Sequence, residues 1–404
     1  MGFQQGLAGL NAAARNLDAI GNNVANANTV GFKSSRAEFA DVYATSLGGS
    51  RSTGLGVAVG QLAQQFTQGD LTTSNNSLDM AINGRGFFRF SQDGITTYSR
   101  NGQMQLDKNG YIVNAQGGRL TGFPVDANGR INGGVPQELK MDTSDILPRQ
   151  TSSGEISVNL ASTEQVSTVP FDSTNPSSYA SATSLSVYDS LGRDHSLAVY
   201  FRKTAGNTWE IYGTTDGAAM GATPLGTLGF TSAGAVDPAT STTPLVINVP
   251  VGADAGGVIP VTFDLSQTTQ YGQQFSVAEL KQDGYSTGRL SGFNVADDGT
   301  ILARYSNGQT PPLGKIAIAN FINPQGLESL GGNQWAESID SGAPMVGSPG
   351  AGSLGTLKSG ALEQSNVDLT AELVNMITAQ RVYQANAQTV KTQDQLLQTI
   401  VNLR

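Results

Sequence analysis

Residues whose types could do chemistry are few in this chain of 404 residues. It has no Cys and one His, His195, which follows Asp194. Without Cys there is no thiolate nucleophile, iron–sulfur cluster or disulfide framework, and a single His excludes a multi-histidine metal centre. No GxSxG elbow accompanies the histidine, so we expect His195 to lie exposed in a turn that precedes a strand. Paired carboxylates of the glycosidase kind stay open, because such partners meet only in space.

Two glycine-rich patterns mimic ligand-binding motifs. The segment Gly350–Gly355 fits GxGxxG, but it follows Pro349 and opens no helix whose N-terminus could hold a pyrophosphate, so we expect a connector. Three Asp-rich segments that end in Gly lack the ligand series and the distal Glu of a calcium loop, so we expect hairpin turns. They are 107–110, 126–129 and 297–299. The sequence therefore predicts no catalytic residue, no cofactor, no metal and no enzyme activity.

The composition of the chain excludes further classes of function. The formal net charge is −9, and charged residues make up 14% of the chain, against about 25% in typical domains. An acidic, charge-poor chain has no electrostatic attraction to nucleic acid or to an anionic membrane. No apolar run approaches the ~18 residues of a membrane span, and the first residues lack a basic segment followed by an apolar one. We therefore expect that the chain does not insert into a membrane. We also expect that it is exported without a cleavable signal peptide.

Apolar residues near the N-terminus alternate at steps of four and three. This rhythm predicts a helix from Phe3 to Val24 whose apolar stripe forms a seam with another helix. The stripe consists of Phe3, Leu7, Leu10, Ala14, Leu17, Gly21 and Val24, and Ile20 widens it. We expect Leu7, Leu10, Leu17, Ile20 and Val24 to serve self-assembly.

The same rhythm returns at the C-terminus. It predicts a helix from Asp368, its N-cap, to about Leu403, some 54 Å long, which one small core cannot cover. The stripe consists of Leu369, Leu373, Met376, Gln380, Tyr383, Ala387, Val390, Asp394, Leu397 and Val401, and we expect its large apolar members to serve self-assembly. Asp394 leaves two alternatives. Either it meets a cation or backbone donors on a neighbouring helix, or a register shift of one residue turns it to solvent.

Between the ends, period-two patterns and Gly, Asn and Asp turns predict strands only. Three candidates, 184–188, 196–201 and 209–212, predict a meander, and Leu47–Gly56 predicts a flexible connector. Further strands are expected at 86–90, 111–113, 245–249, 261–265, 300–305 and 313–319.

The predicted class is α+β, with terminal helices pairing as a coiled coil, an inner β domain and an inserted outer all-β domain. We predict a terminal helical assembly domain with its connector at 1–70 and 365–404. The inner β domain is predicted at 71–145 and 284–364, and the inserted outer domain at 146–283.

Two long segments at opposite ends then point to a family. Leu17–Lys33, which contains Asn-Asn-Val-Ala-Asn-Ala-Asn-Thr, and Ser365–Ala387 resemble the paired terminal motifs of the axial proteins of the bacterial flagellum, those of rod and hook. The positions that carry the motif are Asn22, Asn23, Asn26, Thr29, Gly31, Phe32, Lys33, Asn366, Asp368, Gln380 and Arg381. Rod and hook members share both ends, but the large β insertion between about Asp145 and Asp283 is similar to hook members.

The resemblance implies a structural subunit that self-assembles into a curved, flexible tube and transmits torque from motor and rod to the filament. It implies a homopolymer of many copies, with rod, hook cap and hook–filament junction proteins and the flagellar type III export apparatus as partners. It also implies an extracellular location in the flagellar basal body and hook. A rod subunit is the near alternative, and a secreted β-rich hydrolase is the distant one.

Overall fold

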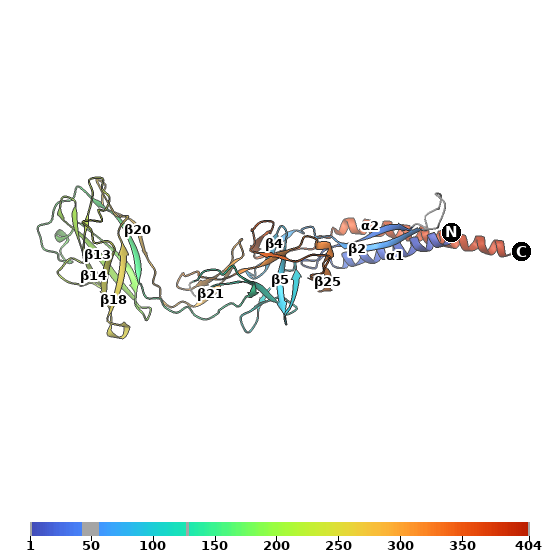
Figure 1. The fold of residues 1–404 in the computed structure, drawn as a ribbon, viewed down its shortest axis with the longest axis horizontal. Coiled ribbons are helices and arrows are strands. Elements are labelled where there is room, and N and C mark those ends of the chain that lie inside the picture. Colours follow the sequence, from blue (N-terminus) through green and yellow to red (C-terminus); the bar gives the residue numbers. More distant parts are fainter. Residues whose placement is uncertain (1, 43–55, 127–128, 403–404) are drawn as a thin grey trace. The chain divides into compact units, whose positions relative to one another are not determined.

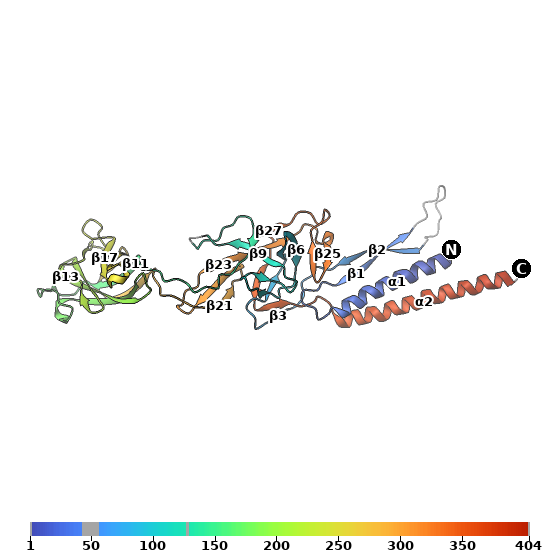
Figure 2. The ribbon, with the colours of Figure 1, turned by 90° about the horizontal axis from the view of Figure 1, so that it is seen from below.

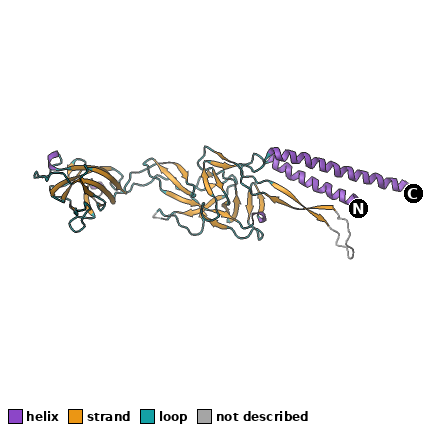
Figure 3. Cartoon of the chain, turned by 90° about the horizontal axis from the view of Figure 1, so that it is seen from above, coloured by secondary structure: helices purple, strands orange, loops and turns teal. Residues whose placement is uncertain are grey.

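The computed structural model describes residues 2–42, 56–126 and 129–402 (Figure 1). A helix lies at each end, α1 (Gly2–Ala25) and α2 (Leu369–Asn402), and strands fill the chain between them (Figure 3). The expectation of a mostly β chain with terminal helices is thus confirmed. Two compact units result. Unit 1 comprises Met1–Thr143, Gly292–Ala303 and Thr310–Arg404, and unit 2 comprises Ser144–Ser291 and Arg304–Gln309.

The two helices lie side by side and antiparallel (Figure 2). Asn23 Nδ2, near the end of α1, donates to Glu372 Oε1 at the start of α2 over 3.1 Å. At the other end of the pair, a Cβ placed on Gly9 would lie 2.8 Å from Asn386 Oδ1, and one on Gly6 would lie 3.0 Å from Val390 Cγ2. Glycine is therefore what allows this close approach. Since Gly6 is level with Val390, the residues of α2 from 394 onward pass beyond the start of α1, as Figure 2 shows.

The start of α2 carries the expected cap. Asp368 Oδ1 accepts hydrogen bonds from the backbone N–H groups of Thr370 (2.9 Å) and Ala371 (3.1 Å). These bonds satisfy donors that the first helical turn leaves without partners. Within the described residues, neither α1 nor α2 is long and apolar enough to span a membrane.

A β-hairpin lies along α1. Its strands, β1 (Ser35–Val42) and β2 (Gly56–Gln64), pair antiparallel with a bulge between Glu38 and Phe39. A Cβ on Gly56 would lie 3.0 Å from Ala8 Cβ, so the hairpin contacts the helix closely. Except for Gly56, the expected connector Leu47–Gly56 lies outside the described residues.

One large sheet dominates unit 1. Its main strand order is β21-β22-β23-β9-β5-β6-β26-β25. The strands are β5 (Phe87–Gln92), β6 (Ile95–Ser99), β9 (Arg119–Pro124), β21 (Leu290–Val295), β22 (Thr300–Tyr305), β23 (Pro312–Ile316), β25 (Glu328–Gly331) and β26 (Gln334–Ala336), with β7 (Gln105–Leu106), β8 (Ile112–Val113), β10 (Gln137–Glu138), β24 (Ile318–Asn320) and β27 (Met345–Gly347) attached. Two further pairs are β28 (Thr356–Ser359) with β4 (Met80–Asn83) and β29 (Ala361–Glu363) with β3 (Leu71–Thr73). Its main core includes Met80, Phe88, Leu120, Ile301 and Ile316, all fully buried.

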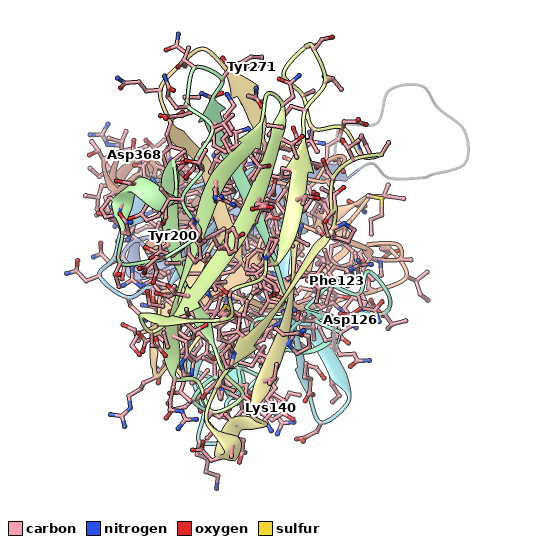
Figure 4. The ribbon with its side chains drawn as sticks, turned by 90° about the vertical axis from the view of Figure 1, so that its left-hand side faces the viewer. Phe123, Asp126, Lys140, Tyr200, Tyr271 and Asp368 are labelled. Atoms are coloured by element: carbon pink, nitrogen blue, oxygen red, sulfur yellow. The ribbon has the colours of Figure 1, made fainter. Side chains whose placement is uncertain are left out.

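Unit 2 consists of two sheets that share one core. One contains β11 (Ser153–Ala161), β17 (Leu245–Pro250), β18 (Val258–Asp264), β19 (Thr269–Tyr271) and β20 (Ser276–Gln282). The other contains β12 (Ser181–Tyr188), β13 (Asp194–Ala205), β14 (Thr208–Thr215), β15 (Ala218–Ala219) and β16 (Gly226–Gly229). Ile156 and Val261 from the first sheet and Phe201 and Trp209 from the second belong to the same buried cluster. Figure 4 draws the side chains as sticks and labels Tyr200, which lies on β13 of this unit.

The expected meander is confirmed, because β12, β13 and β14 pair in order. The other expected strands overlap β5, β8, β17, β18 and β22, and the run 313–319 falls on β23 and β24. The GxGxxG segment lies between β27 and β28 and opens no helix, as expected. Gly110, Gly129 and Gly299 have φ values of 86°, 75° and 83°, which are turn conformations that favour glycine.

Candidate functional site

The N-terminal motif ends α1 and turns the chain. Asn26 Nδ2 donates to Asn22 O (3.0 Å), and Thr29 Oγ1 donates to Asn26 Oδ1 (3.2 Å). Gly31 follows at φ 70°, and a Cβ there would lie 2.6 Å from Asn101 N, so no other residue fits without movement of the backbone. The spacing of Asn, Thr and Gly is thus a helix stop followed by a turn.

Two motif asparagines tie the chain ends together. Asn23, 2% exposed, accepts from Ser35 N (2.8 Å) and donates to Ser35 O (2.8 Å) as well as to Glu372. Asn366 accepts from Ser34 N (2.8 Å) and donates to Gln65 O (2.7 Å). Each amide uses its donor and its acceptor. The two side chains together join α1, the start of β1, the residue that follows β2 and the beginning of α2 with the segment before it.

Beside them lies a buried charge cluster of three residues. Lys33 Nζ is 2.6 Å from Glu363 Oε1, and Arg100 Nη1 is 3.1 Å from Glu363 Oε2. Lys33 also donates to Thr67 O (2.7 Å), and Arg100 donates to Gly84 O (2.8 Å). Burial lowers the pKa of Lys33 and the pKa of Arg100, and Glu363 opposes both shifts. One carboxylate therefore holds two buried cations, and we call Lys33, Arg100 and Glu363 the charge cluster.

Sequence reasoning identified Lys33 but missed its partners. Glu363 is 330 positions from Lys33 and 263 from Arg100 in the sequence. No local sequence pattern could therefore predict the charge cluster. The other motif positions differ in their surroundings. Phe32 is half-buried, whereas Asn22, Gln380 and Arg381 are exposed and lie outside the charge cluster.

The contact between α1 and α2 follows small residues. On α1, Gly6 lies against Val390 and Gly9 lies against Asn386, and the other buried positions of this helix include Ala12, Ala13 and Ala19. Of the residues expected to form the seam there, Ile20 is buried, Leu10, Leu17 and Val24 are half-buried, and Leu7 is exposed. Because small side chains let the two backbones approach, the larger ones are displaced toward the edge of the contact.

On α2, the described side chains that are not exposed are Glu372, Met376, Ala379, Asn386, Ala387, Val390 and Gln393, and Ala379 is the most buried of them. Glu372, Asn386 and Val390 lie against α1. Met376, Ala387 and Val390 belong to the expected stripe, whereas its member Tyr383 is 38% exposed. Leu369, Leu373 and Leu397 are exposed, and the side chain of Val401 lies outside the described ones. Asp394 is exposed and accepts from Gln398 Nε2 (3.0 Å).

Large apolar side chains therefore stay on the outside of α2. We call this set the apolar face of α2. It consists of Leu369, Leu373, Val374, Ile377, Leu396 and Leu397, each between 42% and 59% exposed. Exposed apolar surface of this extent, on a chain otherwise rich in polar residues, is typical of a protein–protein contact.

The expectation for His195 was wrong. The residue lies in β13 opposite Val187 of β12, because the turn between these strands closes before Asp194. Its side chain is 14% exposed, with Nδ1 2.8 Å from Asp216 Oδ2 and Nε2 3.5 Å from Asp189 Oδ2. The hydrogen bond with Asp216, together with Asp189, raises the pKa of His195 against the effect of burial. Among the described residues no group of three or more His, Cys, Asp or Glu side chains could hold a metal ion.

We expect His195 to titrate above the ordinary histidine value, and Asp216→Asn to lower its midpoint. As the chain has one His, an imidazole NMR titration of the whole protein gives a single curve. A raised folded-state pKa adds stability that is complete below the unfolded-state pKa and is lost as pH rises through the folded-state pKa. Unit 2 should therefore melt at higher temperature at pH 6 than at pH 9, and His195→Gln should remove that difference. A midpoint at or below about 6.5 contradicts the assignment.

Family models cover most of the described chain and define its class. The matches are to the flagella basal body rod protein (residues 3–33), the FlgE/F/G D1 domain (81–159), the FlaE D2 domain (159–285) and the C-terminal region of the basal body rod and FlgEFG proteins (358–403). These models place the chain among the axial structural proteins of the bacterial flagellum.

Whole-chain relatives are more specific. The chain is 44% identical to the flagellar hook protein FlgE of Escherichia coli strain K12 and 42% identical to that of Salmonella typhimurium strain LT2, over 100% of both chains in each case. It is 34% identical to the protein of Rhizobium meliloti, covering 98% of that relative. The chain belongs to the flagellar hook protein FlgE family. It is a structural subunit of the hook, which replaces the rod alternative, and hook proteins polymerise into this extracellular part of the flagellum.

A solved structure is similar in fold. The flagellar hook protein FlgE2 of Helicobacter pylori matches 72% of this chain and 99% of its own, with a TM-score of 0.54 at 15% identity.

Proposed function

We propose that the terminal helices are the assembly element of this hook subunit. In this proposal α1 and α2 pair as a coiled coil, and the apolar face of α2 is covered by neighbouring copies in the tube. The observation that carries it is the one-sided coverage of α2. Glu372, Asn386 and Val390 of this helix lie against α1, while its large apolar residues stay exposed. Covering apolar side chains contributes about 25 cal/mol for each Å² removed from water, so polymerisation would supply the missing burial.

The three-part division proposed from the sequence gives each part a task. Residues 1–70 and 365–404 would form the inner assembly domain, 71–145 and 284–364 the inner β domain, and 146–283 the outer domain. The charge cluster and the two asparagines support a rigid connection between the first two parts, because they lock several segments at once. The charge-poor surface supports outer contacts that slide, since weak hydrogen bonds exchange more easily than buried ion pairs. Stiff inner contacts with sliding outer ones describe a joint that bends and still transmits torque.

We further propose rod, hook cap and hook–filament junction proteins as partners, with export by the flagellar type III apparatus without cleavage of a signal peptide. No catalytic role is proposed. The hook protein family supports this assignment over the hydrolase alternative.

Removing the outer domain tests the division of tasks. Arg149 and Tyr285 exchange two backbone hydrogen bonds, of 3.0 and 2.9 Å, so a two-residue Asn-Gly turn can replace 150–284 without moving its neighbours. We expect this variant to form tubes in ammonium sulfate, visible by negative-stain microscopy, with altered curvature or rigidity compared with the parent. A variant that is folded by circular dichroism yet stays monomeric would place essential contacts in the outer domain.

A further inference from the structure

A groove lies between the helix pair and the β1–β2 hairpin. Its volume is about 880 Å³, and α1, α2 and both strands line it. Ala12, Ala13 and Ala379 lie buried along it, while Phe39 and Val382 line it with more than 40% of their surface exposed. The groove is thus apolar in part and open, and its walls are the same two helices that the proposed assembly uses.

The C-terminal part of α2 exposes apolar side chains instead of lining a groove. We call residues 394–402 the overhang, since they pass beyond the start of α1. Leu396 and Leu397 of the overhang are 52% and 53% exposed. Its nine residues would extend about 13 Å as a helix. This segment therefore offers apolar side chains on a short rod, with no α1 residue level with it.

One cation of the groove is exposed enough to meet the overhang. Asp394 is the one charged residue of the overhang. Arg36 lines the groove with 68% of its side chain exposed, and its ion pair with Glu38, at 3.2 Å, is an exposed pair of the kind that contributes about 1 kcal/mol or less. The other charged residue on the groove, Glu372, accepts a hydrogen bond from Asn23 and keeps its negative charge. Arg36 can therefore exchange Glu38 for another carboxylate at little cost.

We propose that the groove binds the overhang of a second copy of this chain, with Asp394 of one copy paired to Arg36 of the next. This rests on the proposed function and names its contact. The contact is heterologous, because groove and overhang are different surfaces, and such contacts build open helical polymers. It also answers the question that the sequence left open for Asp394, in favour of a partner cation.

Cysteine cross-linking tests the contact without background, as the chain has no Cys. Within one chain, Asn23 contacts Ser35 and Gly6 is level with Val390. Asp394 is four residues beyond Val390, so Arg36 and Asp394 are at opposite ends of α1, about 30 Å apart along its axis. A disulfide needs Cα atoms within about 7 Å. Polymers of Arg36→Cys/Asp394→Cys should therefore give covalent ladders on oxidation. Arg36→Cys/Thr392→Cys, with its second cysteine on the opposite side of α2, should not.

Charge reversal gives an independent readout. Arg36→Glu and Asp394→Arg should each slow polymerisation about tenfold, and the double reversal should restore it to within about twofold. Asn375→Cys in the groove should react with a maleimide in the monomer and be protected in the polymer. Protection already in the monomer would mean that the same chain fills the groove, and it would overturn the inference. Normal tubes without Arg36→Cys/Asp394→Cys ladders would also overturn it and leave the assembly proposal standing.

Discussion

Glu363→Gln is expected to lower the free energy of unfolding of unit 1 by about 3–5 kcal/mol, the range for breaking a buried ion pair from one side. The substitution removes the one carboxylate that holds Lys33 and Arg100 and leaves two buried cations without a counter-charge. Thermal unfolding should show the loss, and hydrogen exchange should place it at the end of α1 and in β1.

Asp298→Asn is the matched control. It breaks the ion pair of Asp298 with Lys315 in the same unit, at 2.9 Å, but the Asp298 side chain is 55% exposed. Exposed pairs contribute about 1 kcal/mol or less, so its effect should be small. If Glu363→Gln melts as close to the parent as the control does, the charge cluster does not hold the junction together.

Ile377→Asp is expected to raise the protein concentration needed for polymerisation at least about a hundredfold. Ile377 lies on the apolar face of α2 and is 51% exposed in the subunit. A carboxylate there costs little in the monomer, because water reaches it, but it would be buried unpaired in the polymer, at several kcal/mol. Sedimentation of polymers against monomer concentration measures the change.

Val246→Asp provides the comparison. Val246 is 50% exposed on β17 of unit 2, so the substitution makes the same chemical change on a surface that the proposal assigns to sliding contacts. We expect it to polymerise like the parent. Ile377→Asp tubes that form at the parental concentration would show that the apolar face of α2 is not an assembly surface.

The terminal helices were predictable because their apolar rhythm is local. The seam between them was predictable only in part. Counting large apolar residues gave Leu7 and Leu373, whereas the two helices approach closely at Gly6 and Gly9. Glycine and alanine carry weak hydrophobic signals, yet they decide how closely two helices approach. The apolar rhythm thus indicated both helices, whereas the residues at which they approach most closely carry no such signal.

Residues far apart in sequence escaped prediction for a different reason. Lys33 belongs to a motif, but nothing near Arg100 or Glu363 indicates that these three side chains meet. His195 was misplaced because its neighbour Asp194 suggests a turn, while the strand already begins at Asp194. Its partner Asp216 is 21 positions away, beyond the next strand. Such pairings follow from topology, which a pattern of residue types does not contain.

The glycines of α1 delay the point during synthesis at which this helix becomes stable. Gly6, Gly9 and Gly21 lie inside the helix, and each weakens it by about 1 kcal/mol relative to alanine. Alone, the N-terminal segment therefore has little reason to hold its shape, and its partners Glu363, Asn366 and α2 are the last to be made. A chain that stops before residue 363 has no counter-charge for Lys33 and no helix to pack on α1. Only a chain that has been translated through Glu363, Asn366 and α2 can therefore form the helix pair. An incomplete chain lacks the surface that the proposed assembly uses.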